Sequence, residues 1–535
     1  MSESEKSRRL KQFGACLMVC GTAVCGGAEL PPDRELRELA VRDSLNPVAP
    51  GGVNGAPFWN GHARRFIYAP AFDFKPVEGA VRYRFTATDA AGERHSFEAA
   101  SPAAALTPVW DRLPVGFVEL AVEGVGASGK VTGTAGKRRF YRAAVFRGHY
   151  SDAERGYLDS ARMGLQYLFR QPHYRNWLEK GEPDPGYELY CYPTKIIASV
   201  VESMVIYAAL APADRETALG IARKAADYLI SVSEPAGAPL EFLPPTYAGD
   251  KRTAKEFAGQ QMMIYPADAA SAYLDLYDAC GERRFLEAAL RIARSYRKLQ
   301  LPSGSWYLKI NMKDGTPVAS NQCVPVPMIR LFERLGAQYG ETAFRETAER
   351  AVRYLAGTTL KEFNWEGQFE DIAPSVPYVN NTKHNACDYA LYLLDRFPDR
   401  PEAVEQARTL LRFAEDQFVV WEQPMPDKST RTDQWITPCV LEQYAYYVPI
   451  DASAAKLISL CQAMYERTGN VLDLAKACEL ANAMTRAQDP ETGRYLTYWE
   501  RNERGLDPGW INCATASAKA MMSLGRLLEQ KKPAL

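Results

Sequence analysis

Residues from about 57 to 146 alternate between apolar and polar side chains. The pattern is clearest over 81–87, 117–122 and 140–145, and segments rich in Gly, Pro and Asp separate these stretches. Alternation with a period of two predicts half-buried antiparallel strands. Because several such strands fit between 57 and 146, we expect a small antiparallel β-sandwich domain there.

Beyond residue 150 the pattern changes to a helical period, and it repeats. Alanine-rich amphipathic runs begin near Glu154, Asp214, Glu282, Thr342, Glu402 and Asn470. Each is followed by a long loop and a more apolar second helix, expected near 193–211, 265–279, 325–338, 384–396, 438–447 and 511–529. A period of this length predicts a repeat architecture built from helix pairs.

Six helix pairs favour a ring that closes on itself. An open solenoid needs capping repeats and usually has shorter units, whereas a toroid places the apolar helices inside and needs no caps. We therefore expect a mainly α protein, with an (α/α)6 toroid over 150–530 preceded by the β-sandwich over 57–146. A seventh pair built from 448–466 is the alternative.

The N-terminus predicts export. Residues 1–28 have a basic start, an apolar stretch over 13–24 and small residues before Glu29, which is typical of a secretory signal peptide. The apolar stretch is shorter than the roughly 20 residues that span a bilayer. We expect cleavage after Ala28 and a secreted or periplasmic protein; a lipid anchor at Cys25 or Cys20 and an uncleaved cytoplasmic tail are the alternatives. The proline-rich residues 29–56 are predicted to form a linker.

Composition excludes several classes of protein. The content of 47% hydrophobic and 24% charged residues is that of a folded protein, and a formal charge of −1 gives no general attraction to nucleic acid. The cysteines after residue 28 are scattered singly, which predicts buried free thiols. Zinc-ligand spacing, a phosphate-binding loop, HExxH and GxSxG are all missing, so we predict no metal and no cofactor.

The loops that lead from the first to the second helix of each pair are unusually long. They cover 171–192, 232–264, 300–324, 357–383, 419–437 and 488–510, and in a closed ring they meet at one end. They contain much of the aromatic excess of 29 Tyr and 9 Trp. The aromatic residues are Trp177, Tyr187, Tyr190, Tyr192, Tyr247, Trp306, Tyr307, Trp365, Tyr378, Trp421, Trp435, Tyr495, Tyr498, Trp499 and Trp510. Aromatic side chains at one rim would stack on sugar rings, so we expect a sugar-binding cleft there.

Two of the five histidines lie in this predicted rim. His384 starts the fourth inner helix and His173 lies in the first loop; either exchanges a proton near neutral pH. Asparagine and glutamine side chains there would hold a substrate carboxylate, and Lys309, Lys383 and Arg431 would neutralise it. The expected substrate-binding residues are His173, Tyr190, Trp306, Lys309, Asn321, Gln322, Trp365, Glu366, Tyr378, Lys383, Arg431 and Trp435.

The repeats, the 301–307 text LPSGSWY and the Asn380-Asn381-x-x-His384 segment resemble α/α-toroid polysaccharide lyases acting on uronic-acid chains, such as glucuronan and alginate lyases. The resemblance implies β-elimination of an acidic polysaccharide, with abstraction of the C5 proton and departure of O4. It implies His384 as anion neutraliser or base and Asn380 or Asn381 as carboxylate holder. Tyr307 or Tyr265 would then be the base and acid. The chain departs from this family in having Lys383 directly before His384 and its β-domain at the N-terminus.

Three other functions fit the same sequence. Paired carboxylates are typical of glycoside hydrolysis, and the loops supply Glu366, Glu370, Asp371 and Asp433. A sugar epimerase would use His173 and His384. A surface protein that binds glycans without turnover would use the rim and the β-domain alone.

Overall fold

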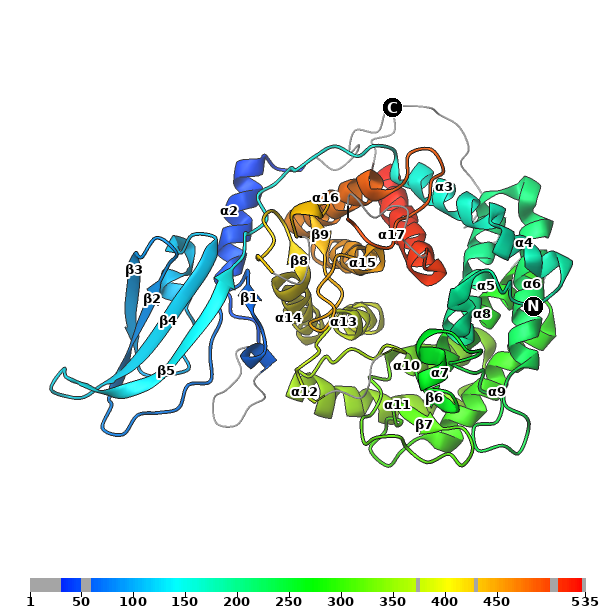
Figure 1. Ribbon diagram of the computed structural model, residues 1–535, viewed down its shortest axis with the longest axis horizontal. Coiled ribbons are helices and arrows are strands. Elements are labelled where there is room, and N and C mark those ends of the chain that lie inside the picture. Colours follow the sequence, from blue (N-terminus) through cyan, green and yellow to red (C-terminus); the bar gives the residue numbers. More distant parts are fainter. Residues whose placement is uncertain (1–29, 50–58, 372–375, 428–431, 501–508, 532–535) are drawn as a thin grey trace.

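The computed structural model describes residues 30–49, 59–371, 376–427, 432–500 and 509–531. A ring of helices makes up most of the molecule, and a small β-sheet lies against one side of it (Figure 1). The predicted signal peptide, its cleavage and lipidation sites, and Arg431 lie outside the described residues.

Six helix pairs form the ring. The outer helices are α3 (Tyr157–Arg170), α6 (Arg215–Ser231), α9 (Arg283–Leu299), α11 (Arg345–Tyr354), α14 (Pro401–Phe418) and α16 (Val471–Ala487). The inner helices are α5 (Pro193–Leu210), α8 (Tyr265–Cys280), α10 (Val326–Tyr339), α13 (His384–Arg396), α15 (Asp451–Thr468) and α17 (Ile511–Gln530). Each inner helix contacts the next, and α17 contacts α5, which closes the ring. The predicted (α/α)6 toroid is confirmed.

The fifth inner helix lies later in the chain than predicted. Residues 438–447 form no helix: they contain β9 (Cys439–Val440), which pairs with β8 (Val419–Val420). The helix is α15, in which Ala454, Leu457 and Ile458 are buried on one face. The 448–466 segment thus supplies most of the fifth inner helix, and the described residues contain no seventh pair. The backbone of Cys439 and Val440 pairs instead with Val420 and Val419, and Pro449 ends the segment because the residue before a proline is disfavoured in the helical region.

Ion pairs join neighbouring inner helices. Arg330 on α10 lies 3.0 Å from Asp395 on α13, Lys456 on α15 bonds Asp388 on α13, and Lys519 on α17 bonds Glu202 on α5. The inner layer is thus more polar than predicted. Helix α5 is the exception: it is apolar and long enough to cross a membrane, but 61% of it is buried inside the protein, as expected of a core helix.

The cysteines of the described part are free, as predicted. Cys191, Cys323, Cys387, Cys439, Cys461, Cys478 and Cys513 are buried, and Cys280 is half-buried.

The N-terminal domain is a single five-stranded sheet in the order β1-β5-β4-β2-β3. Its strands are β1 (Arg65–Phe66), β2 (Arg82–Thr88), β3 (Arg94–Ala99), β4 (Gly116–Val125) and β5 (Val131–Arg142). All neighbours are antiparallel except β1 and β5. The small antiparallel β-domain is confirmed, but the second sheet of a sandwich is absent from the described residues. Connecting segments and the short helix η2 (Thr107–Arg112) supply the second layer instead, with Phe72 and Trp110 packed on Phe140 of β5.

The predicted linker contains a helix. Residues Asp33–Ser44 form α2, which buries Leu36 and Ala40 and places Asp43 2.8 Å from Arg412 of α14. Leu36 and Ala40 are four residues apart and therefore lie on one helix face. This apolar face was not recognised among the flanking prolines.

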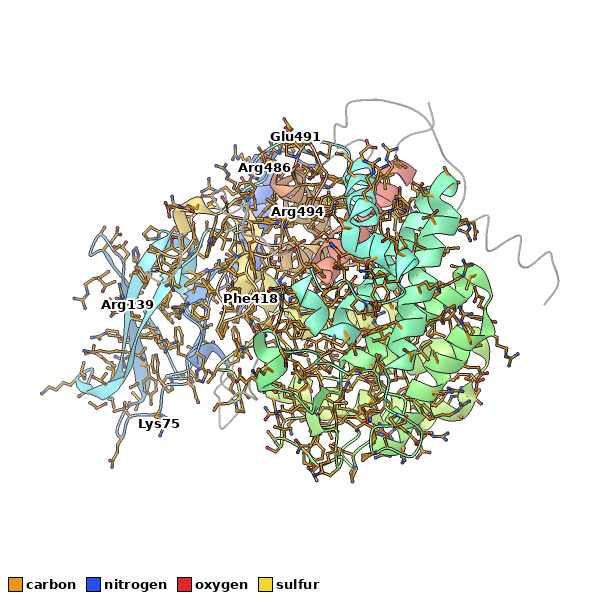
Figure 2. All side chains as sticks on the ribbon, turned by 45° about the vertical axis from the view of Figure 1, so that its right-hand side comes forward. Lys75, Arg139, Phe418, Arg486, Glu491 and Arg494 are labelled. Carbon is orange, nitrogen blue, oxygen red and sulfur yellow. The ribbon has the colours of Figure 1, made fainter. Side chains whose placement is uncertain are left out.

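A buried carboxylate joins the sheet to the toroid. Asp416 Oδ1 on α14 accepts hydrogen bonds from the backbone N–H groups of Ile67 (2.5 Å) and Tyr68 (2.8 Å). Gln417 Nε2 donates to the carbonyl oxygen of Arg65 at 3.0 Å. The neighbouring Phe418 lies between the sheet, which carries Arg139, and the main body of the ring (Figure 2).

Asp416→Ala should lower the free energy of unfolding by about 2–5 kcal/mol, because two buried N–H groups lose their acceptor. Urea denaturation measures this loss. Glu119→Ala is the control: Glu119 pairs with Arg139 at 3.0 Å, but both side chains are more than half exposed, so its loss should be within about 0.5 kcal/mol. Equal effects of the two substitutions would contradict the role assigned to Asp416.

Candidate active site

The first turns of the inner helices and the long loops before them meet at one end of the ring. Lys195 lies in the first turn of α5, Tyr265 is the first residue of α8, and His384 is the first residue of α13. The loops contribute Glu370, which bonds to both Lys195 and Tyr265. Helix N-termini carry partial positive charge, so this end of the ring favours an anionic ligand.

A buried ion pair lies at the centre of this cluster. Lys195 Nζ is 2.7 and 3.0 Å from the two carboxylate oxygens of Glu370, and the Tyr265 hydroxyl donates to Glu370 Oε2 at 2.5 Å. The Tyr247 hydroxyl donates to the carbonyl oxygen of Glu370 at 2.7 Å. Burial alone would raise the pKa of Glu370, but the charge of Lys195 and these side-chain hydrogen bonds lower it below its usual value. Glu370 is therefore an ionised residue whose oxygens are already occupied.

The ion pair also sets the protonation state of Tyr265. Burial and the negative charge of Glu370 raise the pKa of Tyr265 well above its usual value. The Tyr265 hydroxyl is therefore protonated and bonded to Glu370 at neutral pH, and its role as base and acid stays a prediction. The ring of Trp510 lies 4.6 Å from Lys195 Nζ and is half-exposed, so it borders the site.

Asp371 and Lys309 lie beside the ion pair. Burial and the charge of Glu370 raise the pKa of Asp371. Lys309, on β7 (Lys309–Asn311), is 1% exposed, and its Nζ lies 3.6 Å from the ring centroid of Phe257. Burial lowers its pKa to about 8, although Asp371 and Glu370 act in the opposite direction. Lys309 thus remains largely charged at neutral pH.

His384 is half-buried and has no fixed partner. Its backbone N–H donates to Thr382 Oγ1 at 3.4 Å, but no residue in the described part of the chain hydrogen-bonds to its imidazole ring. Phe369 packs against the ring at 5.5 Å, nearly at a right angle. Burial and the charges of Lys383, Lys456 and Lys195 hold the pKa of His384 well below its usual value. The imidazole is therefore neutral at neutral pH and able to accept a proton.

Glu442 provides an acidic group near the start of α13. Burial raises its pKa to about 7, and the positive charges of Lys383 and Lys195 oppose that rise. Lys383 is fully buried; its Nζ donates to the carbonyl oxygen of Glu442 at 2.8 Å and to the Ser453 hydroxyl. Burial lowers the pKa of Lys383. Lys383 is thus part of the scaffold, and Glu442 is a carboxylic acid that stays partly protonated near neutral pH.

The two asparagines before His384 differ in their side-chain contacts. Asn380 Nδ2 donates to Gln443 Oε1 at 3.0 Å, and its Oδ1 accepts from the N–H of Ala445 at 2.8 Å. Asn381 is completely buried, and both polar atoms of its amide have no hydrogen-bond partner among the described residues. The Asn380 side chain thus positions the segment that carries Glu442, and the carboxylate-holding role of Asn381 stays a prediction.

The aromatic rim is mostly a packed interior. Trp177, Tyr190, Tyr192, Tyr247, Trp306, Trp365, Trp421, Trp435, Tyr495 and Trp499 are buried, and Tyr187, Tyr307, Tyr378, Tyr498 and Trp510 are half-buried. The Trp306 indole donates to the carbonyl oxygen of Tyr296, and that of Trp435 to Glu500. The predicted stacking of Tyr190, Trp306, Trp365 and Trp435 on sugar is therefore wrong: these rings fill the space under long loops, where Trp brings both apolar area and a hydrogen-bond donor.

Two predicted residues lie in loop packing. His173 stacks on Tyr187 at 4.3 Å, and burial lowers its pKa to about 4. Tyr378 donates its hydroxyl to the carbonyl oxygen of Glu362 at 2.8 Å.

The other predicted residues lie in the third, fourth and fifth loops. Asn321 donates to Glu366 Oε1 at 3.2 Å, and Ser303 donates to Gln322 Oε1 at 2.7 Å. Tyr307 is half-buried on the third loop, and Asp433 is exposed.

Lys195 and Glu442 were not singled out from the sequence. Lys195 lies three residues inside an apolar helix, and a charge at the start of such a helix is a usable signal. Glu442 was placed in a helix that does not exist. With the fifth inner helix at Asp451–Thr468, Glu442 lies in the loop before that helix, where its carbonyl oxygen accepts from Lys383.

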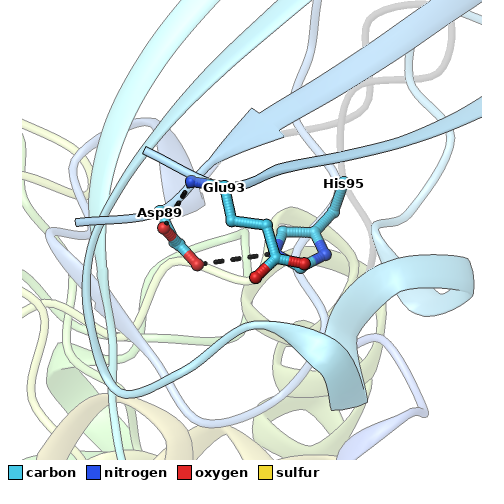
Figure 3. A group of neighbouring side chains, drawn as sticks. All are labelled: Asp89, Glu93 and His95. Atoms are coloured by element: carbon cyan, nitrogen blue, oxygen red, sulfur yellow. Dashed lines mark hydrogen bonds and ion pairs between the residues drawn. The ribbon is translucent and has the colours of Figure 1, made fainter. Parts of the chain in front are cut away.

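One group in the described residues has the spacing of metal ligands. Asp89, Glu93 and His95 offer ligand atoms within 4.8 Å of one another at the β2–β3 hairpin (Figure 3). Asp89 Oδ1 already accepts from the N–H groups of Ala91 and Glu93, and Glu93 is exposed. These bonds are those of an ordinary turn closed by an aspartate, so the group carries no argument for a bound ion.

No family model matches the chain, and no curated protein matches its sequence. Solved structures with a similar fold include a cellobiose 2-epimerase from Spirochaeta thermophila, 13% identical, with a TM-score of 0.51 over 70% of this chain and 98% of that chain. A family 76 glycoside hydrolase from a bovine Bacteroides thetaiotaomicron strain is 10% identical, with a TM-score of 0.42 over 85% and 94%. An unsaturated glucuronyl hydrolase specific for heparin is 8% identical, with a TM-score of 0.42 over 70% and 97%. The chain thus shares the α/α-toroid fold with the epimerase.

Proposed function

We propose that this protein is a carbohydrate-active enzyme that cleaves a uronate-containing polysaccharide by β-elimination, with His384 as the base. The observation that carries the proposal is the neutral imidazole of His384, which has no partner in the described residues and starts an inner helix beside lysines and helix N-termini. A base of this kind suits a substrate that brings its own negative charge.

The surroundings of His384 favour a carboxylate on the substrate. Lys195, Lys383 and Lys456 all lower its pKa by their positive charge. A bound uronate would offset these charges and raise the basicity of His384 at the moment when a proton must be taken. The positive ends of the inner helices act in the same direction.

The reaction needs one base and one acid. His384 would take the proton from C5 of the uronate, and the electron pair would form the C4–C5 double bond as the C4–O4 bond breaks. Glu442, partly protonated because its pKa is raised, would give its proton to the departing O4. The products are one chain with a new hydroxyl and one chain with an unsaturated uronate at its end.

A panel of glucuronan, alginate, pectate, glycosaminoglycan and neutral glucan tests this proposal. Elimination gives a new near-ultraviolet absorbance on an acidic member, and mass spectrometry finds products without added water. Failure of every acidic member to give this absorbance would overturn the proposal.

Glu442→Gln should remove the alkaline limb of the pH–rate profile. A general acid must be protonated, so the native rate should fall as the pH rises through about 7, the pKa of Glu442. The amide does not titrate, so the variant should show a lower rate, by about 10²-fold or more, without that fall. Glu188→Gln, a change to an exposed carboxylate paired with Lys251, is the matched control and should keep the native profile. A native-like profile in Glu442→Gln would remove this residue from the mechanism.

Hydrolysis is the second candidate, and one observation favours it. The site contains a carboxylate of lowered pKa, Glu370, together with Asp371 and Glu442, whose pKa values are raised. Carboxyl groups whose pKa values are pushed apart are typical of glycosidases. Hydrolysis adds one water to the products and creates no chromophore on a saturated substrate, so the same panel separates the two reactions. Export, predicted from residues 1–28, would place either enzyme where polymeric glycans occur; the mass of the mature protein tests it.

A further inference from the structure

A cavity lies where the N-terminal sheet meets the toroid. It has a volume of about 150 Å³, and its lining residues are His62, Arg64, Arg65, Val379, Gln417, Tyr444 and Tyr447. On this measure a single water needs roughly 10–15 Å³, so the cavity has room for a larger polar group. Both domains build it, since Arg65 belongs to β1 and Tyr447 to the loop before α15.

Arg65 is a buried cation, and one of its guanidinium nitrogens has no acceptor in the described part of the chain, although its charge acts on the nearby Asp416. The residue is 3% exposed, and its Nη1 is buried with no hydrogen-bond acceptor among the described residues. The nearby Asp416 is occupied by the N–H groups of Ile67 and Tyr68 and by Gln417. A buried guanidinium is normally paired, because taking its charge out of water is costly.

Tyr447 adds a second buried polar group beside Arg65. Its hydroxyl donates to no acceptor in the described part of the chain. Burial raises the pKa of Tyr447, and the charge of Arg65 and a side-chain hydrogen bond with it act in the opposite direction. The hydroxyl of Tyr444, by contrast, donates to Gln417 Oε1 at 2.7 Å, and Gln417 Nε2 donates to the carbonyl oxygen of Arg65. The unsatisfied groups of the cavity therefore include a guanidinium and a phenol, and both can donate.

The basic side chains in the described lining of the cavity are not balanced by acidic ones. Arg64, Arg65 and His62 supply basic groups, and no Asp or Glu is among the described residues that line the cavity. Arg64 already pairs with Asp427 at 3.0 Å, which leaves Arg65 as the buried cation to be matched. The group that fits these donors is an oxyanion, and the planar fork of arginine matches a carboxylate best.

We propose that this cavity binds the carboxylate of an acidic sugar, through Arg65 and the Tyr447 hydroxyl. The oxyanion follows from the cavity alone; its assignment to a sugar rests on the proposed function. The cavity would then hold a uronate unit of the same polysaccharide outside the catalytic cluster.

One short segment connects the cavity with the candidate active site. Residues 442–447 carry Glu442 at one end and Tyr447 at the other. Between them, the N–H of Tyr444 donates to the carbonyl oxygen of Asn381 at 3.1 Å, and the N–H of Ala445 donates to Asn380 Oδ1 at 2.8 Å. A ligand bound to Tyr447 would therefore contact the same short segment that carries Glu442, the proposed acid.

Calorimetric titration of the full chain with glucuronate, glucose and sulfate tests the proposal. Glucuronate should bind, glucose should not, and sulfate should bind more weakly. Arg65→Gln should weaken glucuronate binding by at least about tenfold, because it removes a charge-assisted bond. Tyr447→Phe removes one hydroxyl and should weaken it about fivefold. Tyr444 lines the same cavity, but Tyr444→Phe removes a bond to Gln417 and none to the ligand. The affinity of this variant for glucuronate should therefore stay within about twofold of the native value.

The outcomes separate this site from the catalytic one. Binding that survives in His384→Ala but falls in Tyr447→Phe supports the cavity even if no glycan is turned over. Glucuronate that binds no better than glucose, or that binds equally well to native protein and Tyr447→Phe, overturns the proposal. Equal affinity for sulfate would overturn the assignment to a sugar carboxylate. Tyr447→Phe keeps the ring and its packing, so it serves even if Arg65→Gln fails to fold.

Discussion

Replacing His384 by alanine should lower kcat/KM on the acidic glycan by about 10²- to 10⁴-fold, the usual contribution of a positioned base. The imidazole has no hydrogen bond to the described residues, so its removal takes away few contacts and should leave the thermal midpoint nearly unchanged. The rate of appearance of the near-ultraviolet absorbance measures the loss, and circular dichroism confirms the fold.

His173→Ala is the matched control for this experiment. His173 is the other histidine of the predicted rim, but it stacks on Tyr187 and burial lowers its pKa to about 4. Its replacement should change the thermal midpoint more than the rate. A His384→Ala enzyme within about threefold of the native rate would remove His384 from the chemistry. A large loss in both variants would point instead to an epimerase-like use of two histidines.

Replacing Glu370 by alanine should lower the free energy of unfolding by about 3–5 kcal/mol, because it leaves the charge of Lys195 buried and unpaired. The side chains of Glu370 and Lys195 are 2% and 16% exposed. The substitution also removes the acceptor of the Tyr265 hydroxyl. Urea denaturation followed by tryptophan fluorescence measures the change.

Two further variants show whether charge is the cause. Glu188→Ala breaks the pair with Lys251, whose side chains are 57% and 53% exposed, and should cost less than about 1 kcal/mol. The double variant Lys195→Met, Glu370→Gln removes both charges and keeps an acceptor for Tyr265. It should recover at least half of the lost stability. A double variant as unstable as Glu370→Ala would show that packing, not the uncompensated charge, sets the loss.

The fold was predictable where a period was repeated many times. The six helix pairs, their order and the end at which the long loops meet followed from apolar spacing, because each pair buries one face against its neighbours. The fifth pair was misplaced, since Pro449 and the β8–β9 pairing are specific to that loop. The helix α2 was missed because two apolar residues, Leu36 and Ala40, are a weak periodic signal.

The site was less predictable because a residue type that binds ligand when exposed serves packing when it is buried. Trp306 and Trp365 have the composition of sugar-stacking residues, and both are completely buried. Asn380 and Lys383 lie next to His384 in sequence, but their polar groups face Gln443 and Ser453. His384 keeps the exposure and freedom that its predicted role requires.

Local sequence patterns are sufficient for the architecture: a small β-domain, a ring of helix pairs and a cluster of long loops around His384. These features depend on local periodicity, which each segment carries in its own residues. Which polar groups are satisfied depends instead on the folded chain. Lys195 meets Glu370 across 175 positions of chain, and Glu442 meets Lys383 across 59. One guanidinium nitrogen of Arg65 is left without an acceptor by the described residues that surround it. Burial, charge pairing and the resulting pKa values arise from contacts between distant segments, so they follow only from the folded chain.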